Sequence, residues 1–228
     1  MNKLILNYKG TLENSLKMFG ILINGVPIAG GIIGGFIGFV DEKLAAKRLK
    51  YLAELLEKKE IDIDDNLIKN EDFLHAIILI VNSVLKTSKE KRIGWFADLL
   101  ENGIKSELII NDSESFEYFE SLLDSVSYSE MLIIEAINEI KDQLQISADG
   151  IDNSKELIQI ALTNIKKYVN YNEDLILGIL DKLTYSGLVE KVAIQAFVFG
   201  AVEASYYYRP SSLYFELRAR IKVELKVT

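Results

Sequence analysis

Residues 71–88 read EDFLHAIILIVNSVLKTS, a stretch in which apolar side chains nearly surround the helix that the spacing predicts. A helix that is apolar on almost every side is stable only when other elements cover it. We therefore expect this stretch to be a buried helix within a mostly α-helical protein.

Amphipathic helices are predicted on both sides of this stretch. Residues 41–59 (DEKLAAKRLKYLAELLEKK) repeat leucine at helical spacing, with Lys and Glu between the leucines. Ser127 and Glu130 form a capping-box pattern ahead of another apolar run. Further helices are expected near 93–101, ended by Asn102-Gly103; from Asp112 or Ser113; near 154–169; and near 172–186, ended by Gly187.

Near the C-terminal end, the spacing of apolar residues changes from a helical period to strict alternation. From Leu213 to Val227 every odd position is apolar and every even position is polar or amphipathic, which predicts a β-strand with one wet face. We expect its partner within 188–208, part of which also reads as a helix, and a turn at 209–212. The predicted fold class is mostly α (α+β), a multi-helix bundle with a long C-terminal β-hairpin.

This pattern suggests three regions. A glycine-rich apolar segment occupies 1–40, a helical bundle 41–148, and C-terminal helices with the hairpin 152–228. The loop around Gly150 is the predicted boundary between the last two.

Composition narrows the classes of function. The 228 residues are 49% hydrophobic and carry a formal net charge of −8, which argues against nucleic acid as the main partner. The absence of cysteine excludes disulfides and thiolate metal sites. His75 is the only histidine, so a Ser-His-Asp triad would have to use it, and no G-x-S-x-G motif accompanies it. We predict no catalytic residues, metal or cofactor, and a non-enzymatic protein.

The unusual feature is the uncharged segment MFGILINGVPIAGGIIGGFIGFV at residues 18–40. Each glycine inside a helix costs about 1 kcal/mol relative to Ala, so a glycine-rich face needs a compensating contact. Close approach of a second helix, or of lipid, supplies one. The predicted assembly or membrane residues are Gly30, Gly31, Gly34, Gly35 and Gly38.

Two interpretations of this segment remain open. As one helix it would span roughly 35 Å, enough to cross a bilayer core. If the helix starts at Pro27, only about 13 apolar residues remain, which fits a buried core helix better. In a membrane, Lys43, Lys47, Arg48 and Lys50 would hold the C-terminal bulk in the cytoplasm. No secretory signal is expected, and the predicted location is the cytoplasm, with or without association with the inner membrane.

An aromatic and basic cluster near the C-terminus is the second candidate site. It could bind an acidic partner or a nucleic-acid strand, or its tyrosines could be cross-strand pairs in a hairpin. The cluster consists of Tyr206, Tyr207, Tyr208, Arg209, Arg218 and Arg220.

Part of the chain resembles a known family. An apolar Gly-rich lead precedes a charged helix and then EKRIGWFADLLENG and SYSEMLIIEAI. The matching positions are Lys91-Arg92, Phe96-Ala97, Leu99-Leu100, Asn102, Glu130, Leu132 and Ile134. Together they resemble the alpha-type abortive-infection family of bacterial helical proteins over residues 25–145, which implies phage defence or growth arrest and carries over no active site. Separately, DKLTYSGLVEK at 181–191 resembles the last helix and first wing strand of a winged helix.

Two functions follow as hypotheses. The first is a non-enzymatic, defence-associated helical protein that self-assembles or contacts membrane through the glycine face. The second is a soluble protein-interaction module that uses its C-terminal hairpin and is winged-helix-like. A homo-oligomer or a protein partner is expected in either case.

Overall fold

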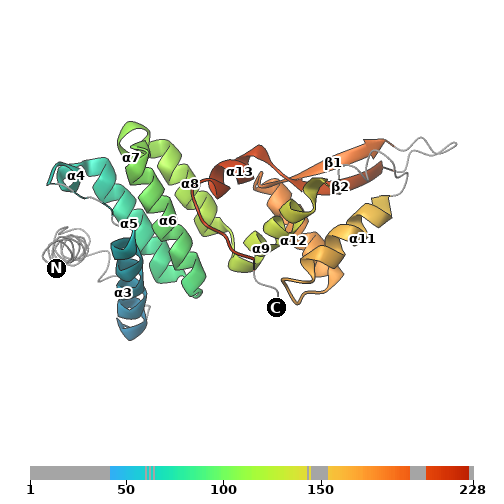
Figure 1. Cartoon of the computed structure of the whole chain (residues 1–228), viewed down its shortest axis with the longest axis horizontal. Coiled ribbons are helices and arrows are strands. Elements are labelled where there is room, and N and C mark those ends of the chain that lie inside the picture. The colour runs from blue at the N-terminus through green and yellow to red at the C-terminus, as the bar shows by residue number, and fades with distance from the viewer. Residues whose placement is uncertain are drawn as a thin grey trace, which may run out of the picture. The chain divides into compact units, whose positions relative to one another are not determined.

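The computed structural model describes residues 42–59, 61, 63, 65–142, 144, 154–195 and 204–225 (Figure 1). They form two compact units. Unit 1 holds the described residues up to Asp124 together with Arg220–Lys222, and unit 2 holds Ser125–Ala219 and the residues after Lys222. The boundary predicted around Gly150 falls within 145–153, outside the described residues.

The described chain is mostly helical and has a small two-stranded antiparallel hairpin near its C-terminal end. The predicted fold class is therefore confirmed. The helices of unit 1 are α3 (Glu42–Lys58), α4 (Asp65–Lys69), α5 (Glu71–Lys86), α6 (Glu90–Lys105), α7 (Leu108–Asn111) and α8 (Ser113–Ser125).

Helix α5 is the buried helix that its sequence predicts. Phe73, Ile80 and Val84 are at most 1% exposed. The helix begins after Asn70, whose side-chain oxygen accepts a hydrogen bond from the Phe73 N–H at 2.8 Å. Helices α3 and α6 both pack against α5 and cover its apolar surface.

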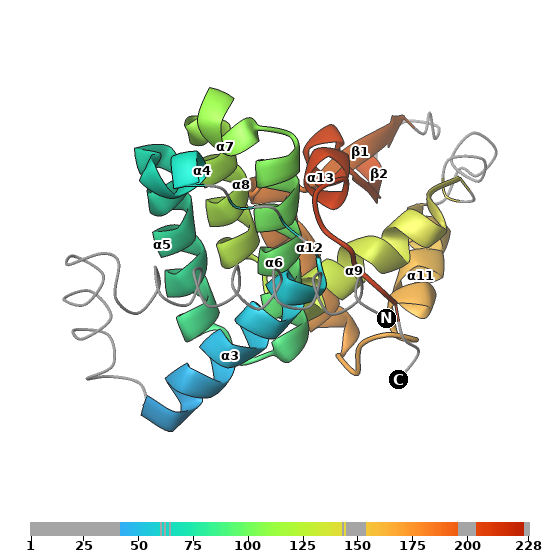
Figure 2. The same ribbon diagram turned by 60° about the vertical axis from the view of Figure 1, so that its left-hand side comes forward.

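Helix α3 runs alongside α6 in the same direction (Figure 2). Near its start, Lys47 Nζ lies 3.0 Å from Oε1 of Glu90. Just past its end, Lys59 Nζ lies 2.5 Å from Asp98 Oδ1 and 2.6 Å from Glu101 Oε2. Burial lowers the pKa of Lys59, but hydrogen bonds to both carboxylates outweigh burial and the pKa is raised. Ion pairs thus fix α3 on α6 near both ends.

A line of polar pairs connects α5 with α8. The pairs are His75–Glu117 at 3.0 Å, Ser83–Glu120 at 2.5 Å and Lys86–Asp124 at 3.8 Å. Glu120 is the most enclosed of these carboxylates, at 6% exposure. Burial raises its pKa, the hydrogen bond from Ser83 opposes that shift, and the net pKa lies above the ordinary 4.5. The contact between α5 and α8 therefore encloses a carboxyl group that is harder to ionise than an exposed glutamate.

Gly103 does not end a helix, contrary to the prediction from Asn102-Gly103. Helix α6 continues to Lys105, and Gly103 lies inside it where Phe116 of α8 approaches. A Cβ at this position would lie 2.8 Å from the Phe116 ring, which is only 1% exposed. The glycine is thus required for close packing of α8 on α6.

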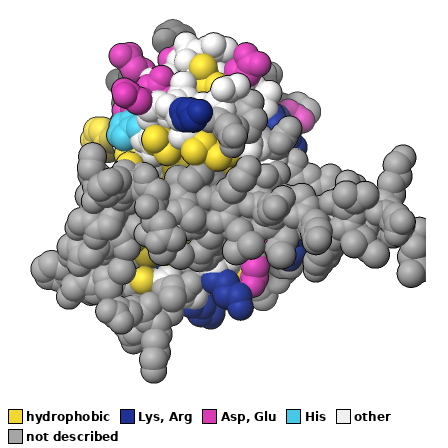
Figure 3. All heavy atoms as spheres, turned by 90° about the vertical axis from the view of Figure 1, so that its left-hand side faces the viewer, with side chains coloured by type: hydrophobic (Ala, Val, Ile, Leu, Met, Phe, Trp, Pro, Cys, Tyr) yellow, Lys and Arg dark blue, Asp and Glu magenta, His cyan; other side chains and the backbone are white. Residues whose placement is uncertain are grey.

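Charge is unevenly distributed on the face drawn in Figure 3. Most visible carboxylates lie at its upper edge, whereas basic side chains are visible both in its upper part and at its lower edge.

Unit 2 consists of helices and the hairpin. Its elements are α9 (Tyr128–Glu139), α11 (Ser154–Ile165), α12 (Glu173–Tyr185), β1 (Val189–Gln195), β2 (Ala204–Pro210) and α13 (Ser212–Arg218). The predicted capping box is confirmed: Ser127 Oγ accepts from the Glu130 N–H, and Glu130 accepts from the Ser127 N–H. Gly187 follows α12 with φ +77°, as expected of a residue just past a helix end. The hairpin packs on α9 and α11 through β2 and on α12 through β1.

The predicted strand at 213–227 is wrong. Ser211 Oγ accepts from the Tyr214 N–H at 3.1 Å and starts helix α13, which buries Tyr214 and Leu217 at helical spacing. Both strands of the hairpin lie earlier, with Val189 opposite Pro210 and Gln195 opposite Ala204. The turn predicted at 209–212 is therefore misplaced, because the hairpin connection falls within 196–203, outside the described residues.

After α13, the three residues Arg220–Lys222 belong to unit 1. The Arg220 carbonyl accepts a hydrogen bond from Asn102 Nδ2 at 2.8 Å, and the Lys222 N–H donates to Asp98 Oδ2 at 2.8 Å. Between them Ile221 is 2% exposed. Val223 is 7% exposed as well, so the alternation at 220–223 buries both of its apolar side chains without strand pairing in the described chain.

Substitution of Gly103 tests its contact with Phe116. Gly103→Ala is expected to lower the free energy of unfolding by about 1–2 kcal/mol, because overpacking outweighs the roughly 1 kcal/mol that alanine adds to helix propensity. Gly94→Ala in the same helix is the control, since a Cβ there meets nothing within 4 Å; it should be neutral or stabilising. Urea unfolding measures both, and equal stabilities would contradict the packing argument.

The buried carboxyl of Glu120 predicts a pH dependence. A raised pKa gives stability that is complete below the unfolded pKa and is lost as pH rises through the folded pKa. Glu120→Gln should remove this loss. The free energy of unfolding of the variant should therefore rise relative to that of the wild type as pH increases above about 4.5. Glu114→Gln, on the exposed side of α8, is the control and should keep the wild-type slope. Urea unfolding over a pH series measures it, and an unchanged slope in Glu120→Gln would reject the assignment.

Candidate functional site

The hairpin presents two different faces within unit 2. Glu190 pairs with Arg209 and Val192 with Tyr207, so these four side chains share one face. Tyr206 and Tyr208, next to Tyr207 along β2, lie on the opposite face. The consecutive tyrosines of the predicted cluster therefore do not form one surface.

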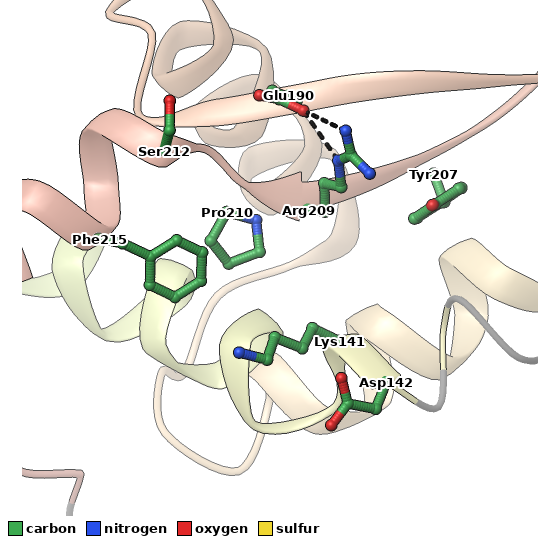
Figure 4. A pocket seen from close by; sticks show the side chains of 8 residues that line it. All are labelled: Lys141, Asp142, Glu190, Tyr207, Arg209, Pro210, Ser212 and Phe215. Atoms are coloured by element: carbon green, nitrogen blue, oxygen red, sulfur yellow. Dashed lines mark hydrogen bonds and ion pairs between the residues drawn. The ribbon is translucent and has the colours of Figure 1, made fainter.

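An open cavity of about 420 Å³ lies beside the first face, and we call it the hairpin cavity (Figure 4). It is bordered by the hairpin, the start of α13 and the residues just after α9. Its lining consists of Lys141, Asp142, Glu190, Tyr207, Arg209, Pro210, Ser212 and Phe215.

A two-contact ion pair lies across the hairpin at the cavity wall. Nε and Nη2 of Arg209 both lie 2.8 Å from Oε2 of Glu190. Both side chains are nearly half exposed, so the pair contributes little to stability. Its effect is to fix the direction of the guanidinium at the wall (Figure 4).

The opposite wall carries a cation with an aromatic partner. Lys141 Nζ lies 4.8 Å from the ring centroid of Phe215, whose side chain is 40% exposed. Among the described residues no carboxylate forms an ion pair with Lys141. Phe215 also packs edge-to-face on Tyr214, with ring centroids 5.1 Å apart. The cavity thus offers a positive charge next to an accessible aromatic ring.

The polar side chains on the other face of the hairpin pair with one another and with α12. Tyr208 OH donates to Asp181 Oδ1 at 2.8 Å, and Lys191 Nζ lies 3.1 Å from the same oxygen. Lys191 also lies 3.8 Å from the ring centroid of Tyr206. The hydrogen bond from Tyr208 lowers the pKa of Asp181, and burial raises that of Tyr208. These four residues fasten the hairpin to α12.

Arg218 and Arg220, predicted to share the wet face of a strand, are separated. Arg218 at the end of α13 pairs with Glu135 of α9, a carboxylate only 5% exposed. Burial raises the pKa of nearby Tyr214, and the Glu135 carboxylate raises it further. Arg220 belongs to unit 1, where its guanidinium lies 3.9 Å from the ring centroid of Phe119. Of the predicted cluster, only Tyr207 and Arg209 reach the hairpin cavity.

Sequence reasoning missed Lys141, Asp142, Glu190 and Phe215. The pairing of Glu190 with Arg209 needs the correct hairpin register, and no sequence signal near 141 marks a binding residue. The alternation of apolar and polar residues predicts Phe215 on the apolar face of a strand. A helix from Ser212 instead leaves Phe215 on the accessible side.

The other sequence-based candidates give no further site. The predicted glycine residues, from Gly30 to Gly38, lie outside the described residues. His75 pairs with Glu117 on the surface of unit 1. Across the described ranges, no three His, Asp or Glu side chains are grouped as they would be to hold a metal ion. Within the same ranges, no helix is both long and apolar enough to cross a membrane.

Comparison of the chain with protein-family models, curated proteins and solved structures finds no match.

The pairing of Arg218 with buried Glu135 predicts a structural role for this arginine. Arg218→Ala should lower the free energy of unfolding by about 2 kcal/mol, because Glu135 is left buried without its cation. Arg209→Ala, which removes an exposed pair, should cost about 0–1 kcal/mol. Chemical denaturation measures both. Adding Glu135→Gln to Arg218→Ala should restore part of the loss, and a purely additive double variant would contradict a direct interaction.

Proposed function

We propose that this chain is a non-enzymatic helical interaction protein whose unit 2 binds a protein partner in the hairpin cavity. The observation that carries the proposal is the position of Lys141 beside the exposed ring of Phe215, without a described carboxylate partner. A cation next to an aromatic ring suits a peptide segment in which a carboxylate stands beside an apolar side chain.

The residues around the cavity support binding more than catalysis. Ser212 lies in the lining, but the only histidine of the chain is residue 75, which belongs to unit 1. Asp142 and Glu190 also line the cavity, and their charges disfavour a phosphate backbone. A protein segment can satisfy both signs of charge, whereas a nucleic-acid strand cannot.

The order of elements supports the winged-helix-like alternative for unit 2. Among the described elements of unit 2, helices α9, α11 and α12 precede the two-stranded hairpin, as helices precede the wing in that class. In such domains the helix before the wing enters the major groove through its N-terminal residues. Here that helix begins with Glu173 and Asp174, and Asp174 and Leu175 are exposed. Carboxylates at this end favour a protein ligand over DNA.

The wider role that we propose is phage defence or growth arrest. The sequence resemblance over residues 25–145 supports this role, and the uncharged glycine-rich segment 18–40 supports self-assembly or membrane contact as its means. The glycine face would bring copies of the chain, or the chain and a bilayer, together. Unit 2 would then recruit the partner to that assembly.

Site-specific photo-crosslinking tests the hairpin cavity in cells that express the chain and are challenged with phage. A photoreactive phenylalanine analogue replaces Phe215, and in a control it replaces Tyr185, which is 94% exposed on α12. We expect a discrete adduct from position 215 that the additional change Lys141→Glu reduces at least about tenfold, since a cation becomes an anion. Adducts that are identical at both positions, or that Lys141→Glu leaves unchanged, would contradict the proposal.

A further inference from the structure

Basic side chains from two separate stretches meet at one end of unit 1. The ion pair between Lys47 and Glu90, and a hydrogen bond from the Arg48 guanidinium to the Leu85 carbonyl, place the first half of α3 beside the α5–α6 connection. We call the resulting surface the basic patch. It consists of Lys47, Arg48, Lys50, Lys86, Lys89 and Lys91.

The basic patch carries an excess of positive charge on an acidic protein. The side chains of Lys47, Lys50 and Lys86 are 70%, 76% and 50% exposed. Among the ion pairs of the described residues, Glu90 pairs with Lys47, Glu54 with Lys50, and Asp124 with Lys86. The basic side chains of the patch thus outnumber these three carboxylates, in a chain whose net charge is −8.

The patch lies close in sequence to the uncharged segment 18–40. One residue separates the end of that segment from the start of α3 at Glu42, and Lys47 lies only about 8 Å along the helix from that start. Cations just beyond an apolar segment are the arrangement that places basic side chains among lipid headgroups. The structure adds Lys86, Lys89 and Lys91, which the sequence places far from this segment.

We infer that the basic patch binds the anionic headgroups of a bilayer surface, an inference that rests on the membrane contact proposed for residues 18–40. The three carboxylates among the cations would repel a phosphate backbone that had to run across the patch. A fluid bilayer differs, because its anionic lipids can gather at the exposed lysines and leave the carboxylates facing neutral headgroups.

Flotation of the full chain with lipid vesicles tests this inference. The vesicles contain phosphatidylcholine alone, or phosphatidylcholine mixed with phosphatidylglycerol. The patch variant is Lys50→Gln with Lys89→Gln. The control variant is Lys58→Gln with Lys69→Gln, which removes the same charge from exposed positions at the other end of unit 1. Circular dichroism confirms that both variants fold.

The wild type and the control variant are expected to float with the anionic vesicles, and added salt should weaken that binding. The patch variant should bind these vesicles about thirtyfold less, since each cation near an anionic surface contributes roughly fivefold. Equal loss in both variants, binding that salt does not change, or patch-dependent binding of duplex DNA that outcompetes the vesicles would overturn the inference.

Flotation with neutral vesicles distinguishes failure of the basic patch from failure of the membrane contact proposed for residues 18–40. Equal flotation of all variants with neutral and anionic vesicles would overturn the binding proposed for the basic patch and leave membrane contact through 18–40 intact. In that case Gly34→Leu should reduce flotation. Absence of flotation with either kind of vesicle would overturn both the basic patch and the proposed membrane contact.

Discussion

Pairing of enclosed carboxylates is the constraint on which both units depend. Asp98 of α6 is 7% exposed and accepts from Lys59 and from the backbone of Lys222. Glu135 of α9 is 5% exposed and pairs with Arg218. A charge withdrawn from water costs several kcal/mol unless a partner meets it, so each carboxylate fixes a segment distant in sequence against its helix. Helix α3 and the C-terminal segment of unit 1 are positioned in this way, as is α13 in unit 2.

The candidate site depends on the same constraint. Because Arg218 is committed to Glu135, α13 presents its other side, with Phe215, to the hairpin cavity. The satisfied cluster of Asp181, Lys191 and Tyr208 holds the opposite face of the hairpin on α12. What remains accessible is a rim of charged and aromatic side chains between the hairpin and α13. In the function that we propose, this rim suits a peptide because its geometry would exist before a partner binds.

Much of the fold could be predicted from local patterns, whereas the candidate site could not. Capping by Ser127, the helix end at Gly187 and burial of α5 each depend on residues within one or two turns. The strand predicted at 213–227 is wrong because the alternation of apolar and polar residues there is also compatible with a short helix. The cap that Ser211 forms stabilises the helix. Gly103 likewise predicts a helix end from the local sequence, and only the position of the Phe116 ring shows that this glycine serves packing instead. Lys141 and Phe215 meet across 74 positions, a contact that no sequence period encodes.

The sequence by itself determined the helical class, the acidic balance, the lack of thiol chemistry and the uncharged glycine-rich segment, because these follow from composition and from contacts between near neighbours along the chain. Only the tertiary structure decided which tyrosines face the cavity, which arginine is structural, and that lysines of α3 and of the α5–α6 connection form one patch. Those outcomes depend on hairpin register and helix packing. Both are set by the pairing and burial of groups far apart in sequence, where the local pattern leaves several arrangements of similar energy.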